Sequence, residues 1–298
     1  MDSEKDNLSK GVTAALIAAI FLTVMNILSK ILAEDLDPVM IAFWRNFFAL
    51  VILVAGLAVT NNMQLMKTAQ LKSQIIRAVI GTAGLILAIW AFSILPLTEA
   101  IVIGFTSPLF VILLSYPLLR ERVGIYRVGA TCIGFIGIIV IVGFDIQSLG
   151  VLGVIVTLGW AFFNGVVIIM LRQLGKKDSA MTTTFYFMLI GLVLCGAYVP
   201  FADKVIPSQP YWWAVGLLGI VGVISLILKT EAYRHAPASV IAPLAYSILL
   251  WTAFLDYIIW NHVASPTIWA GAVIIIAANL FIIWREKQLS KINEGRKV

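Results

Sequence analysis

The stretch LPLTEAIVIGFTSPLFVILLSYPLL, residues 95–119, decides the class of this fold. It contains one charged residue, Glu99, and is otherwise dominated by apolar side chains. An α-helix needs about 20 mostly apolar residues to cross the hydrocarbon core of a bilayer. The stretch therefore predicts a transmembrane helix over Thr98–Leu119.

The rest of the chain has the same character. Of its 298 residues, 61% are hydrophobic and only 12% are charged, and the mean hydropathy is +1.01. Soluble domains carry about 25% charged residues, so this composition excludes a water-soluble enzyme as the main role. We predict an all-α membrane protein with ten transmembrane helices. Their expected ranges are Gly11–Leu32, Pro38–Val59, Ile75–Ser93, Thr98–Leu119, Tyr126–Val142, Leu149–Leu171, Met181–Val199, Tyr211–Leu228, Ser239–Trp260 and Pro266–Trp284.

Cofactor and nucleic-acid chemistry find little support in the sequence. Cys132 and Cys195 lie inside apolar runs, and His235 and His262 lie apart, so we predict neither a disulfide framework nor a clustered metal site. The stretch that begins at Gly175 lacks the upstream glycine spacing of a phosphate loop. The net charge is +6, but the basic residues form no stripe, which argues against nucleic acid. We expect no cofactor.

The basic residues instead predict the orientation, because Lys and Arg stay on the cytoplasmic side of a membrane. With a cytoplasmic N-terminus, most of the 21 basic residues fall on the inner side. Lys30 and Lys204 fall outside, and Arg45 lies within a span. Both termini are therefore predicted to be cytoplasmic. The predicted inner residues are Lys5, Lys10, Lys67, Lys72, Arg77, Arg120, Arg122, Arg127, Arg172, Lys176, Lys177, Lys229, Arg234, Arg285, Lys287, Lys291, Arg296 and Lys297.

An internal repeat divides the chain into two halves. An offset of 141 residues places 95–98 over 236–239 and Phe105 over Tyr246. Asn26 and Asn164 recur at a similar offset, each in the first helix of its half. Five helices in each half would force the second copy to enter the membrane with opposite polarity, as in many secondary transporters. We expect a cytoplasmic segment 1–10, a first repeat 11–142, a linker 143–148, a second repeat 149–284 and a basic cytoplasmic tail 285–298.

Two segments resemble a known family. Leu95-Pro-Leu-Thr-Glu-Ala, Phe105-Thr-Ser-Pro-Leu-Phe, Arg120-Glu-Arg-Val and Gly134-Phe-Ile-Gly resemble the first EamA domain of the drug/metabolite transporter superfamily. Ala232-Tyr-Arg-His-Ala-Pro-Ala-Ser-Val-Ile-Ala-Pro and Trp269-Ala-Gly-Ala-Val-Ile-Ile resemble the second, so the likeness covers nearly the whole chain. Within the family, the C-terminal stretch is similar to bacterial S-adenosylmethionine carriers, with riboflavin and amino-acid carriers also similar.

The resemblance implies a ten-helix bundle in the bacterial inner membrane. Helices one to four and six to nine would line a central cavity, and helices five and ten would lie at the periphery. Alternating access would move a small organic metabolite that is amino-acid-like, nucleoside-like or flavin-like, and aromatic or zwitterionic. Proton coupling and substrate exchange are both open as the driving process, as are a monomer and a homodimer. Membrane lipid is the expected surrounding partner.

Charged residues inside the spans are candidate site residues, because burying them in hydrocarbon is costly unless they face a partner or a water-filled cavity. Arg45 is suited to holding a carboxylate in two parallel hydrogen bonds, or it forms an internal ion pair. Glu99 is a partner for Arg45, a ligand for a cationic substrate group, or a negative charge at a helix N-terminus. Lys229 lies at a cavity mouth or only reflects the positive-inside rule.

Neutral polar and aromatic residues complete the candidate site. Asn26 and Asn164 suit either substrate hydrogen bonds or contacts between helices. Deep aromatic side chains either stack on an organic ligand or face lipid and pack. The aromatic candidates are Trp44, Trp90, Phe105, Trp160, Tyr186, Tyr246 and Trp251.

Two other classes of function are alternatives to a carrier. An intramembrane lipid-modifying enzyme would need clustered acids, yet Glu99, Asp256 and Glu231 lie on different predicted helices and are not expected to converge. A channel-like or structural subunit is the other alternative.

Pro108 inside a predicted span suits a hinge or an ordinary kink, and the small pair Ala130 and Gly134 suits a dimer seam or an internal contact.

Overall fold

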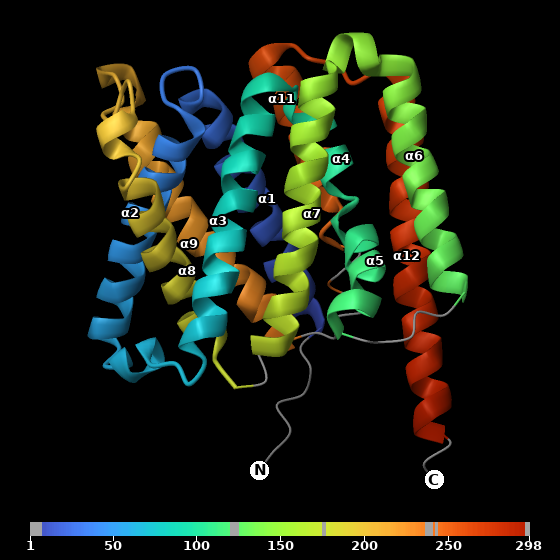
Figure 1. Ribbon diagram of the computed structural model, residues 1–298, viewed down its shortest axis with the longest axis horizontal. Coiled ribbons are helices and arrows are strands. Elements are labelled where there is room, and N and C mark those ends of the chain that lie inside the picture. The colour runs from blue at the N-terminus through green and yellow to red at the C-terminus, as the bar shows by residue number, and fades with distance from the viewer. Residues whose placement is uncertain (1–7, 120–124, 175–176, 236–240, 242–243, 296–298) are drawn as a thin grey trace.

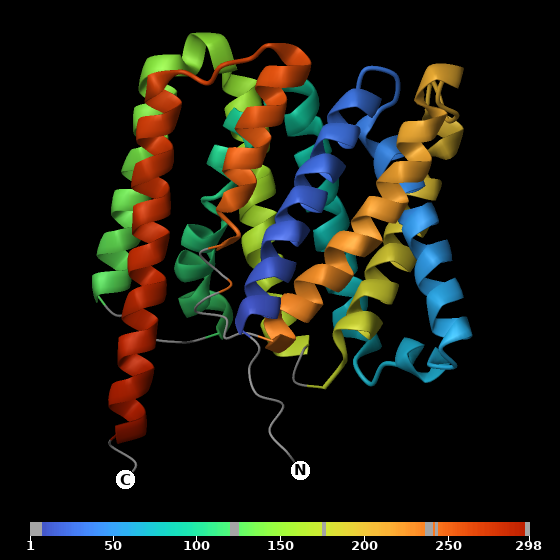
Figure 2. The same cartoon turned by 180° about the vertical axis from the view of Figure 1, so that it is seen from behind.

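The computed structural model describes residues 8–119, 125–174, 177–235, 241 and 244–295, and every regular element in them is helical. Figures 1 and 2 show a bundle of long helices that run up and down between two ends. The α-helices are α1 (Leu8–Leu32), α2 (Pro38–Val59), α3 (Leu71–Ile94), α4 (Leu97–Gly104), α5 (Ser107–Leu119), α6 (Ile125–Leu149), α7 (Val151–Leu174), α8 (Ala180–Gly196), α9 (Trp212–His235), α11 (Ser247–Trp260) and α12 (Pro266–Gly295). Short 3-10 turns are η1 (Met63–Met66), η2 (Val199–Phe201) and η3 (Gln209–Tyr211).

The described helices confirm the predicted all-helical membrane class. Eight stretches are long and apolar enough to cross a bilayer, and two shorter apolar helices accompany them. The eight are Ser9–Leu32, Pro38–Val59, Leu71–Ile94, Leu97–Ser115, Val151–Leu171, Ala180–Phe201, Gln209–Lys229 and Pro266–Arg285, and the shorter two are Val128–Ile141 and Ser247–Trp260.

Some helix ends differ from the sequence prediction. α3 begins at Leu71 rather than Ile75, and α6 runs on to Leu149, so residues 143–148 are helical and not a linker. Gly150 alone separates α6 from α7, and its φ of 70° is a left-handed value that favours glycine. The chain therefore turns between its two halves within one residue.

The helices have two common ends. α1 begins and α12 ends at the lower end of Figure 1, which we call the terminal end, and the opposite end is the distal end. α1 packs on α9, α3 packs on α7, and α6 packs on α12. In both views α6 and α12 stand together at one edge of the bundle (Figures 1 and 2).

Glycines let α6 and α12 approach each other closely. A Cβ added to Gly271 would lie 2.8 Å from the carbonyl oxygen of Gly137, and one added to Gly137 would lie 3.0 Å from the carbonyl oxygen of Gly271. One turn away, a Cβ on Gly134 would lie 2.5 Å from the side chain of Leu109. Ala130 is buried in the same small core as Leu109. The Ala130–Gly134 face is thus an internal contact of the protomer.

The predicted single helix Thr98–Leu119 is interrupted. α4 ends at Gly104 and α5 begins at Ser107, with a turn at residues 105 and 106. Pro108 causes the break, because it has no N–H to donate to the carbonyl of Gly104 and its ring clashes with that carbonyl in a continuous helix. Proline also disfavours the helical conformation of the preceding residue. It is tolerated here as the second residue of a new helix.

At this break, polar side chains donate hydrogen bonds to backbone carbonyl oxygens in place of backbone N–H groups. The hydroxyl of Thr106 donates to the carbonyl oxygen of Ile103 at 2.7 Å, and the hydroxyl of Ser107 donates to that of Gly104 at 2.8 Å. Asn279 of α12 donates from Nδ2 to the carbonyl oxygen of Phe105 at 2.9 Å. These three hydrogen bonds support the break within a buried part of the bundle, where backbone groups need partners inside the protein.

A second break lies at the repeat-related position. Residues 245 and 246 form a turn immediately before α11 begins at Ser247. Part of the predicted helix before it, including Pro243, lies outside the described residues. The rings of Phe105 and Tyr246, one from each break, are 4.9 Å apart in an edge-to-face arrangement. The two breaks thus meet near the middle of the bundle.

Candidate functional site

A cavity of about 490 Å³ lies between the helices, within the range of small-molecule sites. Its described lining residues come from α1, α2, α3, α4, α7, α8, α9 and α11 and from residues 105 and 245, and none of those described comes from α6 or α12. This division agrees with what the family resemblance implied. The lining residues are Leu22, Met25, Asn26, Ser29, Arg45, Arg77, Gly81, Gly84, Leu85, Ala88, Ile89, Phe92, Ile101, Gly104, Phe105, Trp160, Asn164, Val167, Leu171, Phe187, Lys229, Ala245 and Ile248.

Helical periodicity explains how α3 and α7 present one face to the cavity. On α7, Trp160 and Asn164 lie four residues apart and Leu171 follows seven residues later, a spacing that keeps side chains on one side of a helix. On α3, Arg77 is followed by Gly81 on the same face. The glycine leaves space where a larger side chain would fill the cavity.

The cavity opens toward the terminal end. Lys229 and Leu171, which lie near that end of α9 and α7, are exposed. At the distal end, Leu95, Leu97 and Thr98 are at most 3% exposed. The exposed part of the cavity wall therefore lies toward the terminal end.

A polar network closes the distal end. Asp256 of α11 accepts hydrogen bonds from the backbone N–H of Thr98 at 3.0 Å and from its hydroxyl at 2.9 Å. The ammonium of Lys30 lies 3.5 Å from the other oxygen of Asp256 and 4.4 Å from the centre of the Trp260 ring. The network joins α1 and α4 of the first half to α11 of the second. It therefore holds the two halves together at the closed end.

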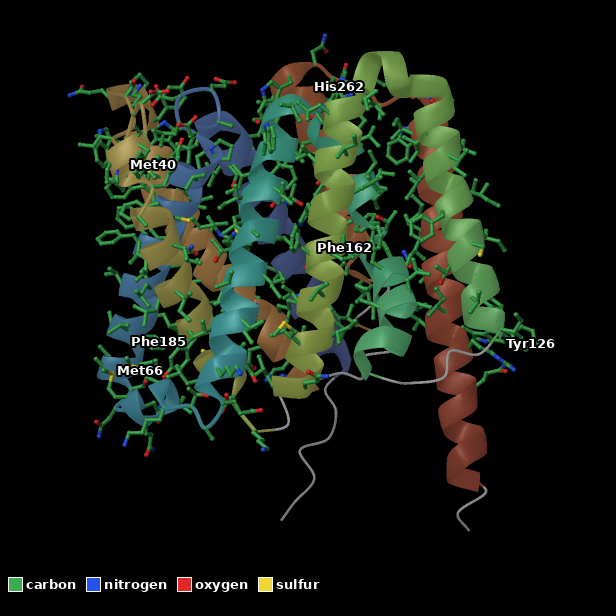
Figure 3. The ribbon with its side chains drawn as sticks, viewed as in Figure 1. Met40, Met66, Tyr126, Phe162, Phe185 and His262 are labelled. Carbon is green, nitrogen blue, oxygen red and sulfur yellow. The ribbon has the colours of Figure 1, made fainter. Side chains whose placement is uncertain are left out.

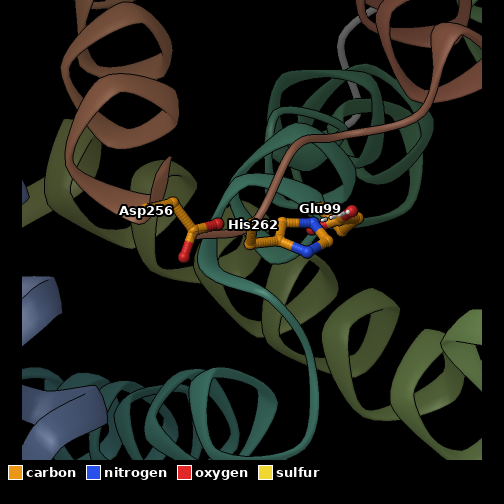
Figure 4. A group of neighbouring side chains, drawn as sticks. All are labelled: Glu99, Asp256 and His262. Atoms are coloured by element: carbon orange, nitrogen blue, oxygen red, sulfur yellow. Dashed lines mark hydrogen bonds and ion pairs between the residues drawn. The ribbon is translucent and has the colours of Figure 1, made fainter. Parts of the chain in front are cut away.

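Glu99 lies beside this network. Its carboxylate is 2.7 Å from Nε2 of His262, in the connection between α11 and α12 (Figure 4). Figure 3 shows His262 at the distal end of the bundle. Donor atoms of Glu99, Asp256 and His262 all lie within 4.8 Å of one another. The expectation that Glu99 and Asp256 would not converge was therefore wrong. The start of α4, which carries Glu99, lies beside the last turns of α11, which carry Asp256.

The donor set at this cluster does not favour a metal ion. Both oxygens of Asp256 already have partners, and the ammonium of Lys30 is one of them. A cation placed between the three residues would be repelled by that ammonium. We interpret the cluster as part of the closure and not as a metal centre.

Arg45 and Glu99 do not pair with each other. Arg45 lines the cavity, whereas Glu99 does not. Within the described part of the chain, neither a hydrogen bond nor an ion pair involves Arg45, while Glu99 has His262 as its partner. The guanidinium of Arg45 is therefore available to the contents of the cavity.

Arg77 is a site residue that the sequence analysis missed. It was assigned to an inner segment under the positive-inside rule, but it lies inside α3 and lines the cavity. Its guanidinium carbon is 4.4 Å from the centre of the Phe187 ring. Its Nε and Nη1 are buried and have no hydrogen-bond partner. The signal in the sequence was its position only two residues inside a predicted span.

The other predicted site residues divide into two groups. Asn26, Arg45, Phe105, Trp160, Asn164 and Lys229 line the cavity. Tyr246 packs on Phe105 beside it. Outside the lining are Trp44, whose indole N–H donates to the carbonyl oxygen of Val205 at 2.8 Å, and Tyr186, which packs on Phe185. Glu99, Trp90 and Trp251 also lie outside it, and the last two are exposed.

Trp160 and Asn164 connect the cavity to the broken helix. A Cβ on Gly104 would lie 2.6 Å from the Trp160 ring, so the end of α4 fits against the indole only because it is glycine. The side-chain amide of Asn164 donates to the hydroxyl of Ser107 at 3.1 Å. Both side chains therefore join the wall of the cavity to the break between α4 and α5.

Two aspartates outside the spans anchor opposite ends of the bundle. Asp35, after α1, accepts hydrogen bonds from Lys204 and Ser208. Desolvation alone would raise the pKa of Asp35, but these hydrogen bonds outweigh it and lower the pKa below its ordinary value. We call this set of hydrogen bonds a clamp, because it joins Asp35 of the first half of the chain to Lys204 and Ser208 of the second half.

Asp178, after α7, forms the corresponding clamp. It accepts hydrogen bonds from Thr68 at 2.5 Å and from Gln74 at 2.7 Å. Its pKa is likewise lowered, since hydrogen bonds outweigh the opposing effect of burial. Asp178 follows Asp35 by 143 residues and Ser208 follows Thr68 by 140 residues, which is close to the repeat offset of 141. The clamps lie at opposite ends of the bundle, because α1 ends at the distal end and α7 at the terminal end.

Comparison with known proteins gives consistent results. The model of the EamA-like transporter family matches the chain twice, over residues 9–143 and 151–284. The chain is 28% identical to the pseudopaline exporter of Pseudomonas aeruginosa, covering 92% of this chain and 95% of the relative. It is 27% identical to an S-adenosylmethionine uptake transporter of Rickettsia bellii (94% and 95% covered) and 27% identical to a riboflavin transporter of Vibrio cholerae (83% and 84% covered).

A solved crystal structure shares the fold. It superimposes with a TM-score of 0.64 at 17% sequence identity, over 93% of this chain and 98% of the other. Two matches of one family model, which together span both halves of the chain, establish the relationship on sequence. The chain belongs to the EamA-like transporter family, whose members in this comparison are named as carriers of small metabolites.

Proposed function

We propose that this protein is a secondary carrier that moves a small organic metabolite across the bacterial inner membrane by alternating access. The observation that supports this most is the cavity of about 490 Å³, which is lined by both halves of the chain and contains charged side chains. Charged groups at membrane depth are tolerated where they face such a space. Family membership supports the same class of function.

The two halves act, in this proposal, as inverted repeats in a ten-helix bundle. The clamps of Asp35 and Asp178 support it, because residues related by the repeat make related contacts at opposite ends of the molecule. The helix breaks at Phe105 and Tyr246 support it in the same way. Discontinuous helices that meet at the repeat interface are typical of secondary transporters.

The conformation described here is the inward-open one. This assignment combines the predicted cytoplasmic termini with the opening of the cavity at the terminal end. Transport then requires the network of Asp256, Thr98 and Lys30 to open at the distal end while the terminal end closes. The relatives include an exporter and an uptake transporter, so family membership does not fix the direction of transport.

Proteoliposomes provide the test. A carrier shows uptake that saturates with substrate and is accelerated by substrate on the opposite side, whereas a channel shows neither. Arg45→Ala is expected to reduce the flux of a carboxylate substrate to background while the protein still inserts and purifies normally. Absence of saturable flux for amino acids, nucleoside-like compounds and flavins alike would contradict the proposal, and undiminished flux in Arg45→Ala would remove Arg45 from the site.

A further inference from the structure

Among the residues that the structure describes, Arg77 in the cavity has no counter-charge. Arg77 is 9% exposed, and its buried Nε and Nη1 have no partner. A guanidinium stays protonated under all physiological conditions. The ring of Phe187 offers a favourable contact to its face but neutralises no charge. A buried charge left without a partner is costly. A bound substrate should therefore supply the negative charge that the empty cavity lacks.

Two further cations face the same space. Arg45 lies in α2, and Lys229 is exposed at the cavity mouth in α9. Neither forms an ion pair with any described residue. No Asp or Glu occurs among the described residues that line the cavity. The site is therefore positively charged without internal compensation.

The cations lie at different depths. Arg77 is six residues into α3 from the terminal end, since 77 − 71 = 6, and Arg45 is fourteen residues from the end of α2, since 59 − 45 = 14. At 1.5 Å per residue these positions are about 9 Å and about 21 Å along their helices. Lys229 is likewise six residues from the terminal end of its own helix, α9, which ends at His235. The arrangement favours two separated acidic groups over a single compact one.

We propose that the substrate is an organic anion with at least two acidic groups, one held at the mouth by Arg77 and Lys229 and the other held deeper by Arg45. Its body packs against the aromatic wall formed by Phe105 and Trp160. This inference rests on the proposed carrier function and narrows the amino-acid-like, nucleoside-like and flavin-like candidates to those with net negative charge. Arginine pairs with carboxylates and phosphates in two parallel hydrogen bonds, so both kinds of acid fit.

A series of four compounds that share one aromatic ring tests the charge preference. Phenethylamine is a cation, phenylalanine a zwitterion, N-acetylphenylalanine a monoanion and N-succinylphenylalanine a dianion at neutral pH. Binding to the purified full-length protein is measured from the ligand-dependent rise in melting temperature. We expect the dianion to bind best and the cation worst. A preference for the cation, equal affinity across the series, or no shift with the dianion would overturn the proposal.

Single-residue variants test whether Arg77 is responsible for the binding of the dianion. Arg77→Gln should weaken dianion binding by about tenfold or more, as expected for a lost charged hydrogen bond, and should weaken phenylalanine binding less. Lys72→Gln is the matched control, because Lys72 is exposed on the same helix and lies outside the cavity. If Lys72→Gln and Arg77→Gln weaken dianion binding equally, the preference for anions comes from the overall surface charge. The role of Arg77 in holding an acidic group would then be wrong.

An empty-protein measurement adds a readout that needs no ligand. If Arg77 lacks a counter-charge, Arg77→Met should raise the melting temperature of the empty protein while abolishing the shift caused by the dianion. A lower melting temperature of Arg77→Met would make Arg77 a structural residue. Counterflow of radiolabelled phenylalanine and N-succinylphenylalanine in proteoliposomes separates the two levels of the argument. Saturable flux of the zwitterion alone would overturn the anion proposal but leave the proposed carrier function intact. A flux of both compounds that rises linearly with concentration would overturn the carrier function itself.

Discussion

Asn279 of α12 donates a hydrogen bond of 2.9 Å from Nδ2 to the carbonyl oxygen of Phe105, within the break between α4 and α5. Asn279 is 1% exposed. The peripheral helix α12 thus supports the broken helix at the cavity although it lines no part of the cavity itself.

Replacing Asn279 should weaken this support. Asn279→Leu leaves a buried carbonyl oxygen without its donor, so we expect a loss of about 1–3 kcal/mol in the free energy of unfolding. Unfolding in mixed micelles measures it, with Val273→Ala on the exposed face of the same helix as the control. Equal stability of Asn279→Leu and the wild type would show that water or another group serves Phe105.

The closed distal end makes a second prediction. Asp256→Ala removes the acceptor of the Thr98 N–H and the counter-charge of Lys30, and breaking a buried pair of this kind costs about 3 kcal/mol. A double-mutant cycle of Lys30→Met and Asp256→Asn should show coupling above about 0.5 kcal/mol, the usual limit for independent sites. Additive losses of unfolding free energy would mean that the ion pair does not close the halves.

Acid should weaken the two aspartate clamps. Hydrogen bonds lower the pKa values of Asp35 and Asp178 below the ordinary value of 3.8. A carboxyl with a depressed pKa in the folded state contributes stability that is fully present above the unfolded-state value. That contribution is lost as the pH falls through the folded-state pKa.

The melting temperature should therefore fall steeply below about pH 4. The double variant Asp35→Asn, Asp178→Asn should melt lower at neutral pH and show a shallower decline in acid. Thermal scans between neutral pH and pH 3 check this. Parallel curves for the two proteins would assign the acid sensitivity to other groups.

Two glycine substitutions provide a matched test of packing. A Cβ at Gly271 would clash with the side chain of Ile141 and lie 2.8 Å from the backbone of Gly137, whereas a Cβ at Gly216 would meet nothing within 4 Å. Gly271→Ala should cost about 1–3 kcal/mol of unfolding free energy through overpacking. Gly216→Ala should be neutral or stabilise the protein by up to about 1 kcal/mol, because alanine favours the helix. The reverse order would contradict the close approach of α6 and α12.

The apolar spans and the helical class could be predicted from the sequence because lipid imposes a strong, local requirement on composition and length. The break at Phe105 and Thr106 is also local, yet it was missed. The sequence prediction keeps Pro108 inside a continuous helix as a hinge or kink, although proline is better suited to the first turn of a new helix. Gly104 and Ser107 beside it strengthen that signal.

The contents of the cavity were less predictable. Arg77 and Lys229 looked like ordinary inner-side basic residues, and only the packing of α3 and α9 shows that their side chains border one space. The contact between Glu99 and His262 joins residues 163 positions apart. No periodicity in the sequence encodes such a pairing, because it depends on how the two halves dock.

Side-specific labelling of a single cysteine in the cavity tests alternating access most directly. Ala88 lines the cavity and is 6% exposed, and Ala88→Cys is introduced after Cys132 and Cys195 are replaced by Ser and Ala. A membrane-impermeant maleimide is applied to inside-out and right-side-out vesicles during substrate turnover. We predict labelling from both sides, with transported substrate slowing the reaction from each. Labelling from one side only during turnover, or from neither, would contradict the account.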